Sequence, residues 1–135
     1  MTRAVPQSAS VLLVDDDPGI LFTFKLILQD AGFEVTAVSR GDAAIRKLEH
    51  TTYDAVIADL NLEREGQGLE IARAAKTTDP PPAVVIYTGY PALEQLRAAM
   101  ALRVDYLALK PVDVDDMKSA LYRLMARRAD CLTCA

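Results

Sequence analysis

Polar residues able to do chemistry follow four apolar runs of the chain, at the points where those runs stop. Carboxylates follow the first and second of these runs, a hydroxyl ends the third, and an ammonium follows the fourth. These residues are Asp15 and Asp16, Asp59, Thr88 and Lys110. Gathered around one point, they would form a site for a cation and a tetrahedral anion.

The carboxylates limit what such a site could bind. Asp15, Asp16 and Asp59 would repel one another, so either one carboxyl stays protonated or a cation lies among them. An oxygen-only ligand set with no histidine or cysteine nearby favours a hard cation, and Mg²⁺ fits best. Phosphoryl transfer needs this kind of positioning and charge neutralisation, and an aspartate can itself be the nucleophile. Asp59 is the predicted nucleophile.

Strands and helices alternate along the chain and must position these groups. Expected strands cover residues 11–15, 33–38, 55–59, 83–88 and 104–109, and expected helices begin at Pro18, Asp42, Leu69, Ala92 and Asp113. The alternation predicts an α/β fold with a parallel sheet covered by helices on both faces. Ligands of such folds bind beyond the carboxyl ends of the strands, where the predicted site residues lie.

Length and charge narrow the class of protein. The 135 residues correspond to about one domain, and the net charge of −4 argues against nonspecific nucleic-acid binding. No apolar run approaches a membrane span of about 20 residues. The first ten residues lack the apolar core of a signal peptide, which predicts a cytoplasmic protein. We expect a flexible extension over 1–9, one domain over 10–128 and a tail over 129–135.

The only cysteines form a C-x-x-C pair, Cys131 and Cys134, near the end of the sequence. Redox-active and zinc-binding pairs need a fold context that this position lacks, since thioredoxin-like pairs follow a strand and open a helix. The pair is therefore interpreted as part of a frayed tail that begins after a last helix ending at Arg128.

Four short motifs resemble those of the receiver domains of bacterial response regulators, a chemotaxis-regulator-like superfamily of two-component signalling. The motifs are Val14-Asp-Asp-Asp-Pro18, Ile57-Ala-Asp-Leu-Asn61, Tyr87-Thr-Gly-Tyr90 and Leu109-Lys-Pro111. Together and in this order they are specific, and the similarity extends from about Ser10 to Met125. It implies a flavodoxin-like, doubly wound three-layer sandwich of five strands in the order 2-1-3-4-5.

The resemblance also implies a function and a role for each site residue. Asp59 would accept a phosphoryl group from a sensor histidine kinase or a phosphotransfer protein. Asp15, Asp16, Asp59 and the backbone carbonyl of Asn61 would hold Mg²⁺. Lys110 and Thr88 would contact the phosphoryl oxygens, and the peptide bond before Pro111 would be cis. Such a domain is a signalling switch and not an enzyme.

Two departures from the family pattern alter these expectations. Glu63 stands where receivers usually have a proline, and the loop 63–68 is one residue longer than usual, so we expect it to be more mobile and more charged. Leu107 stands at the switch position, where receivers usually have Tyr or Phe. Tyr106 is the alternative aromatic residue, but neighbouring side chains of a strand face opposite sides. The usual coupling of an aromatic residue to Thr88 is therefore expected to be absent or altered.

The expected output is a shift of the face formed by residues 92–102, 104–109 and 113–128. Its target would be a downstream protein or an output domain outside this sequence, with homodimerisation possible and no direct binding to nucleic acid or membranes. Two alternatives remain. One is a receiver-like interaction module that works without phosphate, and the other is a Mg²⁺-dependent phosphatase with an aspartyl-phosphate intermediate. The phosphatase is disfavoured because Asn61 replaces its second aspartate and 135 residues leave no room for a cap domain.

Overall fold

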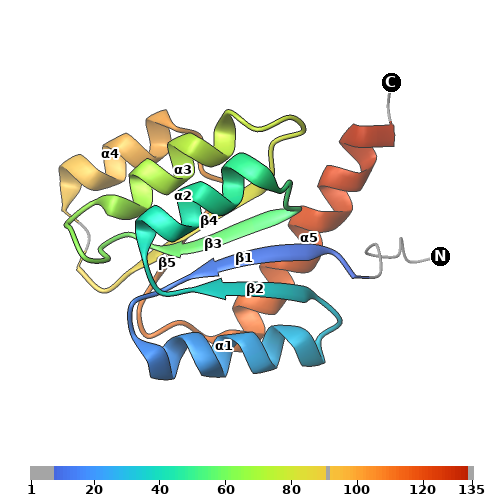
Figure 1. The fold of residues 1–135 in the computed structure, drawn as a ribbon, viewed down its shortest axis with the longest axis horizontal. Helices are drawn as coiled ribbons and strands as arrows, with labels where there is room; N and C mark the ends of the chain where they lie inside the picture. The colour runs from blue at the N-terminus through green and yellow to red at the C-terminus, as the bar shows by residue number, and fades with distance from the viewer. Residues whose placement is uncertain (1–7, 91, 134–135) are drawn as a thin grey trace.

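The computed structural model describes residues 8–90 and 92–133, except for the side chains of 131–133. Five strands and five helices alternate in it and form three layers (Figure 1). The strands are β1 (Ser10–Val14), β2 (Glu34–Val38), β3 (Ala55–Asp59), β4 (Ala83–Thr88) and β5 (Tyr106–Leu109). The helices are α1 (Pro18–Asp30), α2 (Gly41–His50), α3 (Gln67–Lys76), α4 (Leu93–Ala101) and α5 (Val114–Thr133).

All five strands are parallel and lie in the order β2-β1-β3-β4-β5, which confirms the predicted fold. The central strands β3 and β4 are buried along their whole length. Helices cover both faces of a parallel sheet, so its inner strands are continuous apolar runs. The edge strand β5 instead alternates between half-buried and exposed residues.

The sheet separates two hydrophobic cores. On one face the strands pack against α1 and α5, through residues that include Phe24, Leu28, Leu121 and Met125. On the other face they pack against α2 and α3, through residues that include Ala44, Leu48, Ile71 and Ala75. Figure 1 shows this arrangement, with α1 on one side of the sheet and α2 and α3 on the other.

Two helices begin where side chains or backbone geometry allow it. Asp17 caps α1, because its Oδ1 accepts the backbone N–H groups of Gly19 and Ile20 at 2.9 and 3.2 Å, and Pro18 is the first helical residue. Helix α3 begins at Gln67, earlier than the predicted Leu69. The residue before it, Gly66, has φ = 76°. This left-handed geometry turns the chain into the helix sooner than the sequence pattern indicated.

The two ends of the domain also differ from prediction. Helix α5 continues to Thr133, past the predicted helix end at Arg128, so residues 129–133 are helical, and the bounds of the domain and its tail stay a prediction. Ala9, assigned to a flexible extension, is buried, and its carbonyl accepts the N–H of Glu34 at 2.9 Å. Residues 1–7 and the side chains of Cys131 and Cys134 lie outside the described part of the chain.

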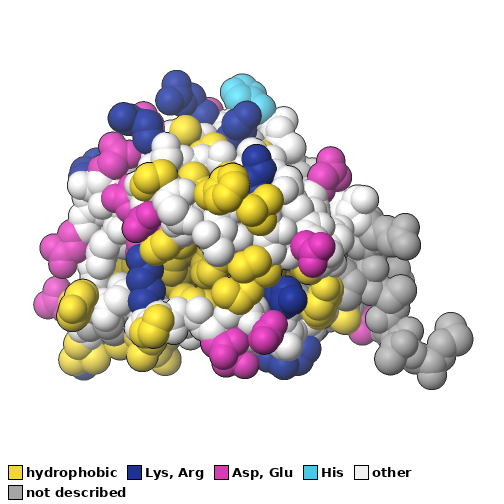
Figure 2. Space-filling view, turned by 90° about the horizontal axis from the view of Figure 1, so that it is seen from below, with side chains coloured by type: hydrophobic (Ala, Val, Ile, Leu, Met, Phe, Trp, Pro, Cys, Tyr) yellow, Lys and Arg dark blue, Asp and Glu magenta, His cyan; other side chains and the backbone are white. Residues whose placement is uncertain are grey.

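The face that carries α1 is partly hydrophobic. Figure 2 looks at the molecule from below and shows hydrophobic side chains in patches across the middle of this face. Phe22 and Leu26 of α1 are 65% and 50% exposed. In the part of the chain that the structure describes, no helix combines the length and hydropathy needed to cross a membrane.

Candidate functional site

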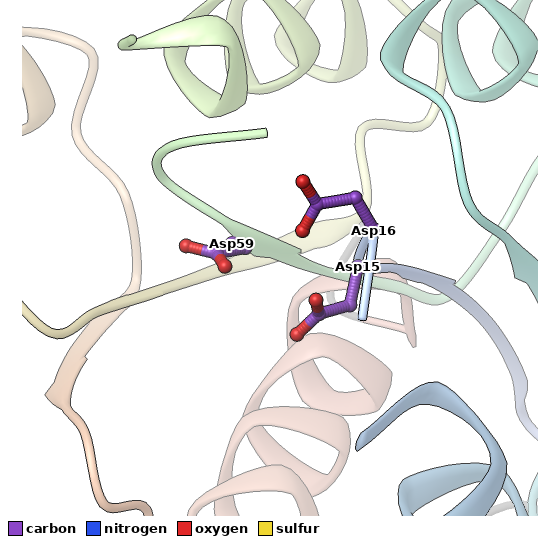
Figure 3. A group of neighbouring side chains, drawn as sticks. All are labelled: Asp15, Asp16 and Asp59. Atoms are coloured by element: carbon purple, nitrogen blue, oxygen red, sulfur yellow. The ribbon is translucent and has the colours of Figure 1, made fainter. Parts of the chain in front are cut away.

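The structure brings the three predicted carboxylates together at the carboxyl edge of the sheet. Asp15 and Asp16 follow β1, and Asp59 is the last residue of the neighbouring strand β3. Each offers one oxygen, and these oxygens lie within 4.8 Å of one another. Figure 3 shows the three side chains near one another at the two strand ends, with their carboxylates pointing to the same side. Asp15 and Asp59 are buried, whereas Asp16 is exposed.

Lys110 lies beside the carboxylate of Asp59. Its Nζ bonds Asp59 Oδ2 at 2.8 Å, and the other oxygen of Asp59 accepts the N–H of Asn61 at 3.2 Å. Burial raises the pKa of the Asp59 carboxyl; Lys110 and the Asn61 N–H oppose this, and the charge of Asp15 adds to it. Burial lowers the pKa of Lys110, but its hydrogen bond to Asp59 and the nearby carboxylates raise it more, so Lys110 keeps its charge.

Asp15 is held by two donors. Its Oδ1 accepts the N–H of Asp17 at 2.8 Å, and its Oδ2 accepts the hydroxyl of Tyr87. Burial, followed by the charge and hydrogen bond of Asp15, raises the pKa of Tyr87, so its hydroxyl remains a donor. The sequence pattern alone did not predict this role of Tyr87. The available signal was a hydroxyl-bearing residue inside the otherwise apolar run that leads to Thr88.

Thr88 is the last residue of β4, and its hydroxyl is buried at the carboxyl edge of the sheet. The oxygen Oγ1 is buried and has no hydrogen-bond partner among the described residues. The backbone of Thr88 is fixed, since its carbonyl accepts the N–H of Lys110 at 2.8 Å. A buried polar group normally finds a partner, so this hydroxyl is available for one that the chain itself does not supply.

The loop after Asp59 is held by the side chain of Asn61. Its Oδ1 accepts the N–H of Gly66 at 2.8 Å and Nε2 of Gln95, in α4, at 3.2 Å. The exposed Glu63 lies 3.5 Å from Arg40 across the gap to α2. The metal contact through the carbonyl of Asn61 stays a prediction, and the link from its side chain to α4 was not expected from the sequence.

Gly68 is a second residue that the analysis did not single out for this role. A Cβ at this position would lie 2.4 Å from the carbonyl oxygen of Asp59 and 2.7 Å from Cα of Leu60. The N–H of Gly68 donates to the carbonyl of Leu60 at 2.8 Å. The first turn of α3 therefore packs directly on the backbone of Asp59, and only glycine leaves room for this contact. The glycine pair Gly66-Gln67-Gly68 was the available sequence signal.

Tyr106 and Leu107 face opposite sides of the edge strand, as alternation predicts. Tyr106 pairs in register with Val85 and packs against the core that includes α1 and α5. Leu107 pairs with Ile86, which belongs to the core on the other face, and is 36% exposed. Of the two, Leu107 therefore lies on the face of Ile86 and Thr88.

The donor set fits a hard divalent cation. Three carboxylate oxygens lie within 4.8 Å of one another, and Lys110 is the only cation paired with any of these carboxylates among the described residues. Like charges this close favour a bound cation, and oxygen ligands favour Mg²⁺. The Lys110–Pro111 peptide bond is cis, the geometry that the resemblance implied.

A doubly wound sheet with an acidic cluster, a lysine and a buried threonine at its carboxyl edge defines a class of phosphoryl-responsive signalling domain. The sequence profile described as the response regulator receiver domain matches residues 11–122. The chain belongs to this family. Receiver domains are signalling switches of two-component systems and generally bind Mg²⁺ at an acidic pocket.

Relatives and solved structures agree with this assignment. The chain is 33% identical over 113 residues to the transcriptional regulatory protein GlrR of Escherichia coli, covering 84% of this chain and 25% of GlrR. It is 33% identical over 113 residues to the photosynthetic apparatus regulatory protein RegA of Rhodobacter capsulatus, covering 83% of this chain and 60% of RegA. The chain thus spans only part of these relatives.

Among solved structures, a CheY-like response regulator receiver domain protein from Methanospirillum hungatei is similar with a TM-score of 0.85 and 26% identity, over 92% of this chain and 98% of that one. A response regulator receiver protein from Sinorhizobium medicae is similar with a TM-score of 0.78 and 33% identity, over 90% of this chain and 97% of that one. These matches cover nearly the whole of both receiver proteins.

Proposed function

We propose that the domain is a phosphorylation-dependent switch in which Asp59 accepts a phosphoryl group from a phosphohistidine of a sensor kinase or phosphotransfer protein. The observation that carries the proposal is the position of Asp59. Its carboxylate is bonded to Lys110 at 2.8 Å and lies in a cluster with two further carboxylates. Positioning and charge neutralisation are what phosphoryl transfer requires.

In the proposed reaction an oxygen of Asp59 attacks the phosphorus of the donor. The new P–O bond makes an acyl phosphate; the donor's P–N bond breaks, and its electron pair stays on the imidazole nitrogen, which takes up a proton. Lys110 is placed to neutralise the phosphoryl oxygens. Asp15, Asp16, Asp59 and the carbonyl of Asn61 would hold Mg²⁺, which when bound supplies charge neutralisation for the phosphoryl group.

A cleft beside the site offers room for the donor. It has a volume of about 860 Å³ and lies between the start of α1, the end of β4 and the turn after β5. Its lining includes Lys110, Tyr87 and Gly89, together with Ile20 and Phe24 of α1. A donor side chain entering there would approach the lysine that is bonded to Asp59.

The proposed response begins at Thr88. Phosphorylation adds about −1.5 to −2 charges near its hydroxyl, which has no partner among the described residues and can then donate to a phosphoryl oxygen. Formation of this hydrogen bond would shift the face formed by α4, β5 and α5 between states that already interconvert. Leu107 is the proposed switch position, because it lies on the face of Thr88, whereas Tyr106 packs on the opposite face.

The partners of the domain are proposed from its relatives. The relatives GlrR and RegA are named as regulatory proteins, and the chain covers only part of each. We therefore propose that the switch acts on an output domain or a separate downstream protein. A cytoplasmic location and a possible homodimer stay predictions.

Intact-mass measurement after incubation with acetyl phosphate and Mg²⁺ tests the proposed function. The wild-type protein is expected to gain the mass of one phosphoryl group, and Asp59→Asn is expected to gain none. Asp42→Asn, which changes an exposed carboxylate on α2, is the matched control and should gain the same mass as wild type. No gain in folded wild-type protein would favour a phosphate-independent interaction module, and steady hydrolysis of small phosphate esters would favour a phosphatase.

A further inference from the structure

Tyr87 joins the hydrophobic core to the acidic site. It lies in β4 immediately before Thr88, and its side chain is fully buried. Its ring packs edge-on against the ring of Phe24 in α1, with the ring centroids 5.9 Å apart and the ring planes at 66° to each other. The side chain is therefore held rigidly where it reaches the site.

The hydroxyl and the ring of Tyr87 contact two different site residues. The hydroxyl donates to Oδ2 of Asp15. Nζ of Lys110 lies 5.2 Å from the ring centroid, within the range of a cation–π contact, while it also bonds Asp59. One rigid residue thus touches both a carboxylate of the cluster and the lysine beside the phosphoacceptor.

The hydroxyl contact meets a specific need of Asp15. This carboxylate is fully buried, and a buried carboxylate is costly unless donors satisfy both of its oxygens. The backbone N–H of Asp17 satisfies Oδ1, and Tyr87 satisfies Oδ2. Donors from the start of α1 and from β4 together fix the plane of the carboxylate. An apolar residue at position 87 would fill the core equally well but would leave Oδ2 without this donor.

We propose that Tyr87 is a positioning residue of the cation site, whose hydroxyl holds the Asp15 carboxylate in the orientation that binds Mg²⁺. The inference rests on the proposed function, because that function requires Mg²⁺ at this cluster. Hydrogen bonds from outside the ligand set orient metal ligands, and their loss typically weakens metal binding about 10–100-fold.

Tyr87→Phe tests this role, because it removes the hydroxyl and keeps the ring that packs on Phe24 and Lys110. Calorimetric titration of the unphosphorylated protein with Mg²⁺ is expected to show a Kd about tenfold or more above that of wild type. Tyr122→Phe is the matched control. It also loses a hydroxyl hydrogen bond, to the carbonyl of Ala31 at 2.9 Å, but far from the cluster, so its Kd should equal that of wild type.

A Tyr87→Phe protein that binds Mg²⁺ as tightly as wild type, or more tightly, overturns the inference and leaves the proposed function intact. Wild-type protein that binds no Mg²⁺ overturns both. If Tyr87→Phe does not fold, tyrosine labelled with ¹³C at the hydroxyl-bearing carbon gives the answer in otherwise wild-type protein. The Tyr87 resonance, assigned by Phe substitution at the other tyrosines, should move on Mg²⁺ addition while that of Tyr122 stays. A Tyr87 resonance that does not move overturns the inference.

Discussion

At the amino edge of the sheet, Asp54 precedes β3, and at the carboxyl edge Asp59 ends the same strand. Asp54 accepts the N–H and hydroxyl of Ser10 at 2.8 and 3.2 Å and pairs with Arg128 at 2.6 Å. Asp59 instead shares its surroundings with two more carboxylates and pairs with Lys110. At the amino edge Arg128 balances the charge of Asp54. At the carboxyl edge one lysine faces three carboxylates, which favours binding of a cation and, with it, a phosphoryl group.

The same contrast holds for the neighbouring strands. At the amino edge Asp105 accepts the N–H of Val84 at 2.7 Å and pairs with Lys76 at 3.4 Å. At the carboxyl edge Thr88 has a buried hydroxyl without a partner among the described residues. Because topology places polar residues at both edges, their partners and not their positions distinguish a structural edge from a reactive one.

The largest expected effect comes from removing the lysine at the carboxyl edge, compared with removing the lysine at the amino edge. Lys110→Ala should slow phosphoryl uptake from acetyl phosphate about 100-fold or more, because it removes a charge aimed at the transferred group. Lys76→Ala, at the amino edge, should leave the rate unchanged. Time-resolved intact-mass spectra measure both rates. Equal rates for the two variants would contradict the difference between the edges.

Neutralising the amino-edge carboxylate should destabilise the fold. Asp54→Asn leaves Arg128, whose side chain is 15% exposed, without its ion-pair partner. We expect a loss of about 2 kcal/mol in the free energy of unfolding, less than for a fully buried pair because the Asp54 side chain is 36% exposed. Urea denaturation measures the loss. Asp115→Asn, which breaks an exposed pair with Lys118, is the control and should change stability by less than about 0.5 kcal/mol.

The same substitution at the carboxyl edge should have the opposite sign. Burial raises the pKa of Asp59, so the folded state favours its protonated form. That contribution to stability is present below the ordinary aspartate pKa of about 4 and is lost as pH rises through the raised value. Asp59→Asn stays neutral, so it should be more stable than wild type at neutral pH.

The pH dependence separates this cause from others. In EDTA, the advantage of Asp59→Asn should shrink as pH falls below about 4, where wild-type Asp59 becomes protonated in both the folded and the unfolded state. Thermal melting across this pH range is the measurement. A variant less stable than wild type at pH 7 would show that the pairing with Lys110 outweighs burial.

The smallest effect is expected in the loop after Asp59. Asn61→Ala frees the N–H of Gly66 and the side chain of Gln95, and should cost about 1 kcal/mol. Amide hydrogen exchange at Gly66 should become faster. Gln95→Ala removes the longer of the two bonds to Asn61, together with a bond from the N–H of Ala92 at 3.3 Å, but keeps the bond to Gly66 and should change that exchange less. Identical exchange in all three proteins would mean that Asn61 does not hold the loop.

The strands and the gathering of the carboxylates could be predicted, since they follow from alternation along the chain and from parallel topology, whereas the order of the strands was implied by the resemblance to receiver domains. Tyr87 could not, because a tyrosine in an apolar run is equally typical of the core, and only the packed sheet brings its hydroxyl to Asp15. The start of α3 depends on the left-handed Gly66.

Contacts between distant segments hold α5 at Arg128, close to its end. Arg128 pairs with Asp54 and donates to the carbonyl of Pro81 at 3.2 Å, which holds the helix against the amino edge of the sheet. Local sequence indicated an end at Arg128, whereas the helix continues to Thr133.

The most direct test of the account identifies the residue that carries the phosphoryl group. Borohydride reduces an acyl phosphate of aspartate to homoserine, whose position tandem mass spectrometry of peptides can locate. After treatment with acetyl phosphate and Mg²⁺, we predict homoserine at position 59 and unchanged aspartate at positions 54, 15 and 16. Homoserine at Asp15, Asp16 or Asp54, or a phosphoryl gain with position 59 unreduced, would contradict the assignment of Asp59 as the phosphoacceptor.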